Sequence, residues 1–326
     1  KCISMIEKKS REYEIEDVFR TYGVLTREAG FYFYFSRKIR ELRESGHEGT
    51  ARAYASSLRS MQRYLGKKDF PFIKLSSRII SDYQGKLLAS GICDNTIGFY
   101  LHNIKALFRK GCREMGLELP CPFRDISIKT KKTLKRSLDP VVIKTLSAIE
   151  LEKDSPLSLA RDIFMFSFYT RGMSFVDIAL LKKRHVFPGE ICYRRHKTDQ
   201  LMRVGINKEI SRILERYKNV PGEYIFPLFP AERDPYAGYR SAYHRIRYSL
   251  GKISRVIGLE FPLRLHAARH SWATIAKVNG ASVHVIGECL GHTSEKTTRI
   301  YLKELDHSAL DAVNNQVADF ILAVDD

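Results

Sequence analysis

The stretch from Arg264 to Leu302 constrains this chain more than any other. It contains His266 and Arg269, whose spacing of three would place both side chains on one face of a helix. A Gly-His pair ending at His292 follows, and Tyr301 stands nine positions further on. Cationic and hydrogen-bonding groups beside a phenol suit phosphoryl transfer to tyrosine, because the cations can hold the non-bridging oxygens while the phenol forms a covalent intermediate.

Each of these residues also has a simpler explanation when it is taken alone. Tyr301 is one of 17 tyrosines, and a tyrosine near the end of a helix is usually a half-buried amphipathic residue. His266 and His270 have the spacing of a zinc pair, yet no Glu lies between them and no Cys pair accompanies them. The ordered occurrence of H-x-x-R-H, L-G-H-T-S and a downstream Tyr favours the catalytic interpretation.

These motifs resemble the C-terminal signature of the tyrosine recombinases, also called phage integrases. The resemblance implies that Tyr301 is the nucleophile, that Arg269 is the second catalytic arginine, and that His266 and His292 contact the scissile phosphate. It also implies a mainly α fold with a small antiparallel β-sheet, in which a helical core-binding domain precedes a mixed α/β catalytic domain.

The sequence departs from the family pattern at the first catalytic arginine. The family has T-G-x-R-x-S-E, and aligning Asp177 with its acidic position puts Ser174 in place of the arginine. The segment RGMSF resembles a branch of conjugative-transposon integrases and invertases that has serine here. Arg171 lies three residues earlier and, on a continuous helix, would be about 4.5 Å along the axis. We therefore expect Arg171 or another basic residue to supply the missing charge.

Residues 184–206 alternate in short stretches around Pro-Gly and Lys-Thr-Asp-Gln turns, which predicts a small antiparallel sheet. The family has a lysine in this hairpin loop, and Lys197 occupies that place. The resemblance implies that its ammonium protonates the leaving 5′ oxygen, since alkoxides leave poorly. Without the resemblance, an exposed hairpin lysine would be expected to be inert.

The composition indicates a polyanionic partner. Fifty-five Lys and Arg against 37 Asp and Glu give a net charge of +18 and a pI near 9.6, which matches a nucleic acid backbone, although a generally basic protein would also fit. The six cysteines are scattered, which favours reduced thiols in a cytoplasmic protein. A DNA partner would make that protein nucleoid-associated. The N-terminus has no hydrophobic core typical of a signal peptide, and no apolar run is long enough for a bilayer.

The expected organisation is a lead-in (1–22), a helical core-binding domain (23–119), a basic linker (120–136) and a catalytic domain with a C-terminal interaction helix (137–326).

Helices are predicted at 26–45, 49–65, 76–90, 95–114, 207–217 and 236–257. Basic residues on these helices and on the linker are candidates for phosphate contacts, although a solvated surface explains each one alone. They are Arg52, Arg59, Lys105, Arg109, Lys131, Lys132, Arg240 and Arg245.

The resemblance implies a site-specific recombinase that needs neither ATP nor a metal or other cofactor. Its expected partners are duplex DNA with inverted-repeat core sites, three further copies of the chain docked through the C-terminal helix, and optional accessory DNA-bending proteins. Two alternatives remain: a topoisomerase of the same chemistry, and a DNA-binding protein whose active site has decayed, which Ser174 makes conceivable. Integration, excision and inversion are not distinguished by the sequence.

Overall fold

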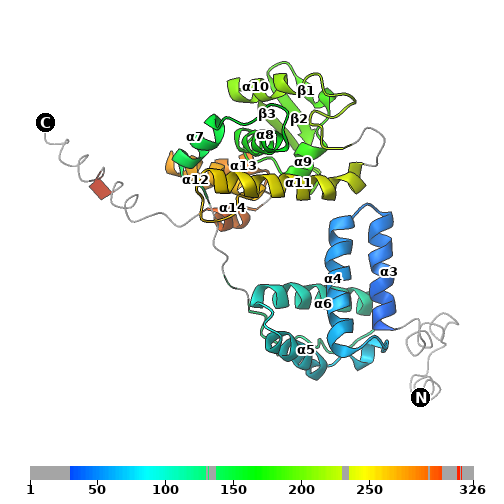
Figure 1. Cartoon of the computed structure of the whole chain (residues 1–326). Helices are drawn as coiled ribbons and strands as arrows, with labels where there is room; N and C mark the ends of the chain where they lie inside the picture. The colour runs from blue at the N-terminus through cyan, green and yellow to red at the C-terminus, as the bar shows by residue number, and fades with distance from the viewer. Residues whose placement is uncertain are drawn as a thin grey trace, which may run out of the picture. The chain divides into compact units, whose positions relative to one another are not determined.

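A computed structural model describes residues 30–129, 131, 137–229, 235–292, 294–302, 314–315 and 317, with the backbone alone at 235–237 and 300–301. The chain divides into two compact units, residues 1–133 and 134–326 (Figure 1). The expected lead-in at 1–22, Lys132 and nearly all of the expected C-terminal helix lie outside the described residues.

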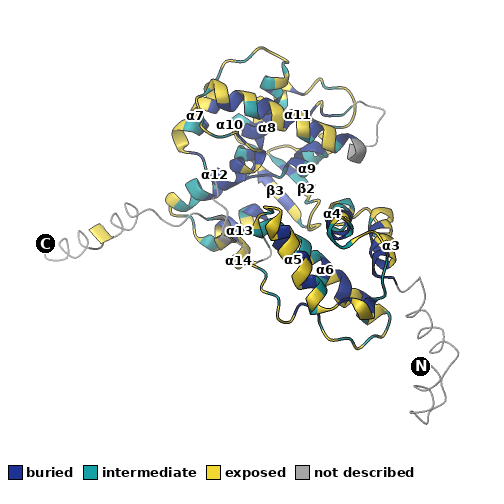
Figure 2. Cartoon of the chain, turned by 60° about the horizontal axis from the view of Figure 1, so that its bottom comes forward, coloured by how far each residue is buried: buried dark blue, intermediate teal, exposed yellow. Residues whose placement is uncertain are grey.

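The first unit is a bundle of helices, and its four predicted helices occupy the expected places. They are α3 (Phe31–Glu44), α4 (Glu48–Leu65), α5 (Ser77–Ala89) and α6 (Asp94–Glu114). The aromatic run at 31–35 packs in the core of this bundle, and Phe33 is the one residue of the run that is exposed. Figure 2 shows the buried residues on the inward faces of these helices and the exposed ones outside.

The start of α3 is fixed by a residue that is distant in sequence. Gly30 offers no side-chain cap to the first backbone N–H groups of the helix. The carboxylate of Asp69 accepts instead from the N–H of Tyr32 at 2.8 Å and of Phe33 at 2.9 Å. Asp69 therefore satisfies two of the N–H groups that every helix leaves unpaired at its N-terminus.

The second unit is organised around α8 (Pro156–Tyr169), whose side chains Ile163, Phe164 and Phe166 are fully buried. Five other helices pack against it: α7 (Pro140–Ala148), α9 (Phe175–Ala179), α10 (Lys208–Arg216), α11 (Pro235–Val256) and α12 (Leu265–Val278). The helices α13 (Val283–Leu290) and α14 (Glu295–Tyr301) follow α12, and a smaller apolar cluster involving Ala273, Ile286 and Leu290 forms beside them. The nucleophile candidate Tyr301 is thus the last residue of a helix.

The predicted antiparallel sheet is confirmed. It has the order β1 (Val186–Phe187), β2 (Glu190–Arg194), β3 (Leu201–Gly205). In the β2–β3 register Ile191 pairs with Val204 and Tyr193 with Met202, and all four side chains are buried on one face. The period of two therefore turns the intervening side chains away from the core.

The assumption that the helix continues through Arg171 is wrong. The helix α8 ends at Tyr169, Arg171 has a left-handed φ of 60°, and α9 begins only after its N-cap Ser174. The N–H of Gly172 donates to the carbonyl of Ser167 at 2.7 Å, which closes a left-handed helix C-terminus. The axial distance between Arg171 and Ser174 expected for a helix therefore does not apply.

Candidate active site

Arg269 joins three segments of the catalytic unit although it is almost fully buried. It extends from α12, and its Nη1 donates to the carbonyl of Gly172 at 2.8 Å. Its Nη2 donates to the carbonyl of Leu290 at the end of α13 and lies 3.0 Å from Nε2 of His292. A buried guanidinium fixed by carbonyls is a preorganised positive group, which is what an anionic transition state requires.

The close approach of Arg269 to the α8–α9 turn depends on a glycine. A Cβ on Gly172 would stand 2.7 Å from Cβ and 2.8 Å from Cα of Arg269, too close for a real side chain. Its φ of +74° is also a conformation that residues with a side chain rarely adopt. Gly172 therefore permits both the turn and the packing of the arginine against it.

His292 follows the left-handed Gly291 that ends α13. Its Nε2 faces Arg269 and its Nδ1 lies 3.0 Å from Oγ1 of Thr298 on α14. Burial, which has the largest effect, and the positive charges of Arg269, Arg195, Lys197 and His266 together lower the pKa of His292 to about 4. The structure thus gathers three other predicted site residues, Arg269, Lys197 and His266, together with Arg195 around the neutral imidazole of His292.

The β2–β3 hairpin is fastened to this site at two places. Nη1 of Arg195 donates to the carbonyl of Gly291, next to His292. The N–H of His196 donates to Oδ1 of Asp177 at 2.8 Å. Lys197 follows directly and is exposed, which leaves its ammonium able to move toward a substrate.

Ser174 has a defined structural role in this arrangement. Its hydroxyl donates to Oδ2 of Asp177 at 2.6 Å and caps the start of α9. It also lines a cavity of about 260 Å³ together with His266 and Arg269, and Tyr239 and Tyr243 of α11 form another part of the wall. A side chain at position 174 therefore faces the same space as two of the predicted catalytic residues.

Arg171 lies near a different part of the site. Burial raises the pKa of Tyr193 and Asp177 raises it further, while the charges of Arg195, Arg269 and Arg171 lower it. Arg171 is thus electrostatically close to the buried Tyr193, and it is absent from the groups that shift the pKa of His292. Arg195 and Arg269 act on both residues.

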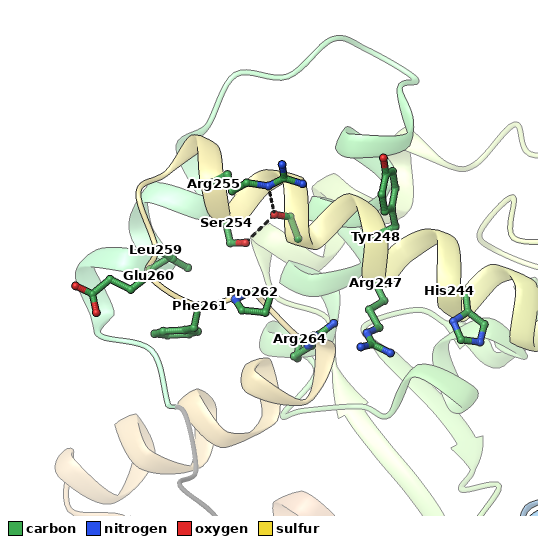
Figure 3. A pocket seen from close by; sticks show the side chains of 11 residues that line it. His244, Arg247, Tyr248, Ser254, Arg255, Leu259, Glu260, Phe261, Pro262 and Arg264 are labelled. Carbon is green, nitrogen blue, oxygen red and sulfur yellow. Dashed lines mark hydrogen bonds between the residues drawn. The ribbon is translucent and has the colours of Figure 1, made fainter.

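A second cavity, of about 710 Å³, lies along the C-terminal half of α11 (Figure 3). Four of its lining side chains, His244, Arg247, Arg255 and Arg264, are basic or can become so. Figure 3 shows the side chains of His244, Arg247 and Arg264 on one side of α11, and Arg264 is two residues before His266. The cavity therefore presents positive charge close to the start of α12.

The structure gives the predicted DNA-contacting residues different environments. Arg59, Arg109 and Arg240 are exposed, and Lys105 is half-buried. Three of the others have partners within the chain. Arg52 pairs with Glu48 at 2.8 Å, Lys131 pairs with Asp94 at 2.9 Å, and Arg245 donates to the carbonyl of Leu228 at 2.8 Å.

We did not predict from the sequence that Thr298, Gly172 or the lining residue Arg264 belongs to the site. The doubled threonine in E-K-T-T-R-I-Y and the glycine after Arg171 were visible in the sequence. Nothing local in the sequence shows that Thr298 contacts His292 or that Gly172 contacts Arg269, because both contacts depend on the fold.

Two family models match this sequence, and together they cover most of the described chain. Residues 137–307 match the phage integrase family, and residues 30–124 match the phage integrase SAM-like domain. The chain belongs to the phage integrase family. Its turn at Leu290–His292, which binds two arginines, and its α14, which ends at Tyr301, are therefore the C-terminal parts of a tyrosine recombinase.

Individual relatives share less of the sequence than of the fold. The tyrosine recombinase XerC of Shewanella oneidensis is 26% identical over 226 residues, which is 66% of this chain and 70% of the relative. The integrase of transposon Tn1549, solved with transposon right end DNA, aligns with a TM-score of 0.64 at 15% identity and covers 89% of this chain and 99% of its own. A lambda integrase tetramer bound to a Holliday junction gives 0.60 at 14% identity, with 90% and 85% covered. These likenesses confirm the predicted mainly α fold.

None of the helices in the described part of this integrase has the length and apolar character needed to cross a membrane.

Proposed function

We propose that this chain is a site-specific DNA recombinase that cuts and rejoins duplex DNA through a 3′-phosphotyrosine formed on Tyr301. One observation carries the proposal: Arg269, Arg195, Lys197 and His266 are grouped around His292. His292 lies nine residues before Tyr301, which ends the next helix, α14. Positive and hydrogen-bonding groups gathered at one point suit the charge that develops on a phosphate under attack.

The proposed chemistry conserves the phosphodiester bond energy. The phenol oxygen of Tyr301 attacks phosphorus, the bond from phosphorus to the 5′ oxygen breaks, and Lys197 donates a proton to that oxygen. Arg269, His266 and His292 hold the non-bridging oxygens. A 5′ hydroxyl from a second duplex then attacks the phosphotyrosine and releases the phenol, so neither ATP nor a metal ion is required.

The cation that compensates for Ser174 is proposed to be Arg195. Its guanidinium donates to the carbonyl of Gly291 beside His292 and lowers the pKa of that histidine. Arg195 also lowers the pKa of Tyr193 more than Arg171 does. Arg194 and Arg203, the other hairpin arginines, pair with Asp199 and Glu190. The geometry therefore favours Arg195 over Arg171, which remains the second candidate.

Contacts to the DNA backbone are proposed along α11 and on the first unit. Arg247 and Arg264 line the basic cavity of Figure 3, and Arg240 is exposed on the same helix. Arg59 and Arg109 are the exposed candidates on the first unit. These side chains would neutralise phosphates without reading sequence, which fixes the position of the enzyme on the duplex.

The assembly is proposed to be a tetramer on inverted-repeat core sites, acting on cytoplasmic, nucleoid-associated DNA. Solved relatives include a dimer on a core site and a tetramer on a Holliday junction, which supports this stoichiometry. The C-terminal segment after α14 is proposed to dock on a neighbouring protomer, because an apolar terminal helix needs a surface to cover it.

A nicked duplex that traps the cleaved strand tests the function directly. The DNA flanking the gene is first sequenced to identify an inverted repeat, which the nicked substrate then carries. Covalent protein–DNA adduct is measured on denaturing gels in the presence of EDTA and without nucleotide. We expect adduct to accumulate under these conditions. Binding of the duplex without any adduct would support the alternative of a decayed active site, and a requirement for magnesium would contradict the mechanism.

A further inference from the structure

Thr298 connects the helix that ends at Tyr301 to the imidazole of His292. Its side chain is fully buried, and its Oγ1 lies 3.0 Å from Nδ1 of His292. A Cβ on Gly287 would approach that oxygen to 2.9 Å, so the glycine of α13 leaves the room that Thr298 occupies. The neighbouring Thr297 is exposed and lies outside this contact.

The partners of His292 determine which ring nitrogen carries the proton. Arg269 can only donate, so Nε2, 3.0 Å from its Nη2, must accept. The pKa of His292 near 4 makes the ring neutral at neutral pH, and its single proton is then on Nδ1. The Nδ1–H therefore donates to the oxygen of Thr298.

Contact with a phosphate oxygen requires the opposite tautomer. A neutral ring can donate to that oxygen from Nε2 only if Nε2 carries the proton, and Nδ1 must then accept. A hydroxyl can act either as donor or as acceptor, so Thr298 can partner both forms of the ring. The half-exposed ring can gain a proton from water at Nε2 and return the Nδ1 proton to water, with no change in net charge.

We propose that Thr298 is a positioning residue whose hydroxyl accepts from His292 in the free enzyme and donates to it when the imidazole binds the scissile phosphate, which keeps the helix of Tyr301 aligned with that phosphate. The inference rests on the proposed function, because it assigns a phosphate to Nε2. It explains why a β-branched hydroxyl residue is fully buried three positions before the nucleophile.

The test compares three variants of the full chain in the trapped-adduct assay. Thr298→Val keeps the volume and removes the hydroxyl, Thr298→Ser keeps the hydroxyl, and Thr297→Val is the matched control on the exposed neighbour. We expect Thr298→Val to slow adduct formation roughly tenfold or more with duplex binding within about twofold. Thr298→Ser should restore the rate to within about threefold, and Thr297→Val should leave it unchanged.

The tautomer is measured separately on the free protein, by nitrogen chemical shifts of ¹⁵N-histidine-labelled chain with His292 assigned by its Asn variant. The wild type and Thr298→Ser should carry the proton on Nδ1 with matching nitrogen shifts. Thr298→Val should keep this tautomer, which Arg269 imposes, but its Nδ1 shift should move because the hydrogen bond to the hydroxyl is lost. An unchanged Nδ1 shift in Thr298→Val, or a Thr298→Ser enzyme as slow as Thr298→Val, would overturn the proposal. Absence of adduct from the wild type would instead refute the proposed function, and the shifts would still test the hydroxyl contact.

Discussion

Two guanidinium groups donate to consecutive carbonyls of one turn, Arg269 to Leu290 and Arg195 to Gly291. The next residue, His292, therefore lies between two fixed positive charges. The family places its first arginine at the position of Ser174, and Ser174 lines the cavity that Arg269 also lines. This arrangement is the basis for proposing that Arg195 of the hairpin supplies the charge that Ser174 lacks.

Arg195→Ala should slow adduct formation by roughly a hundredfold or more, the cost of deleting one preorganised donor, with little change in duplex binding. Arg194→Ala is the matched control, because Arg194 is exposed and pairs with Asp199. Arg171→Ala should have a smaller effect. Adding Ser174→Arg to Arg195→Ala should recover cleavage, since position 174 faces the same cavity. A normal rate in Arg195→Ala combined with a large loss in Arg171→Ala would assign the role to Arg171.

The lowered pKa of His292 makes stability depend on pH in a defined direction. Between about 6.5 and about 4 the unfolded chain binds the proton and the folded chain does not. The free energy of unfolding therefore falls as the pH falls through this window. Thermal unfolding at pH 7 and pH 4.5 should show a smaller loss for His292→Asn than for the wild type. Equal losses in the two proteins would show that His292 titrates normally.

At the scale of elements, the helices and strands that depend on nearby residues were predicted correctly from the sequence. The six predicted helices and the hairpin were found because capping residues and periodicity are local signals. The break after Tyr169 was missed because Arg171 is a non-glycine residue in a left-handed conformation, which sequence seldom reveals. The attachment of the hairpin through Arg195 and the cap of α3 by Asp69 depend on distant segments meeting.

The meeting of α12 with the α8–α9 turn makes Gly172 sensitive to substitution. Gly172→Ala should destabilise the chain by about 2 kcal/mol through overpacking against Arg269 and should also slow cleavage. Gly189→Ala is the control, because Gly189 has a similar φ of +80° but nothing within 4 Å of an added Cβ. The difference in Tm between the two variants isolates the clash from the backbone strain. Equal shifts in Tm would mean that the turn relaxes away from Arg269.

At the scale of the whole molecule, the excess of positive charge should govern binding. A recombinase making on the order of six to ten phosphate contacts should lose about 10³–10⁵ in affinity between 50 and 200 mM salt. Removing Arg247 and Arg264 together should reduce the salt slope by about two. Arg212→Ala is the control, because Arg212 is on α10 and pairs with Glu209. An unchanged slope in the double variant would remove the cavity of Figure 3 from the DNA interface.

The central claim is that Tyr301 becomes covalently attached to DNA. The most direct measurement compares the wild type, Tyr301→Phe and Tyr248→Phe on the nicked duplex, with equal duplex binding verified first. Tyr248 is the control, because it is an exposed tyrosine that lines the basic cavity. The account predicts adduct in the wild type and in Tyr248→Phe, and none in Tyr301→Phe with binding within a few fold of the wild type. Adduct that persists in Tyr301→Phe would contradict it and would assign the nucleophile to another residue.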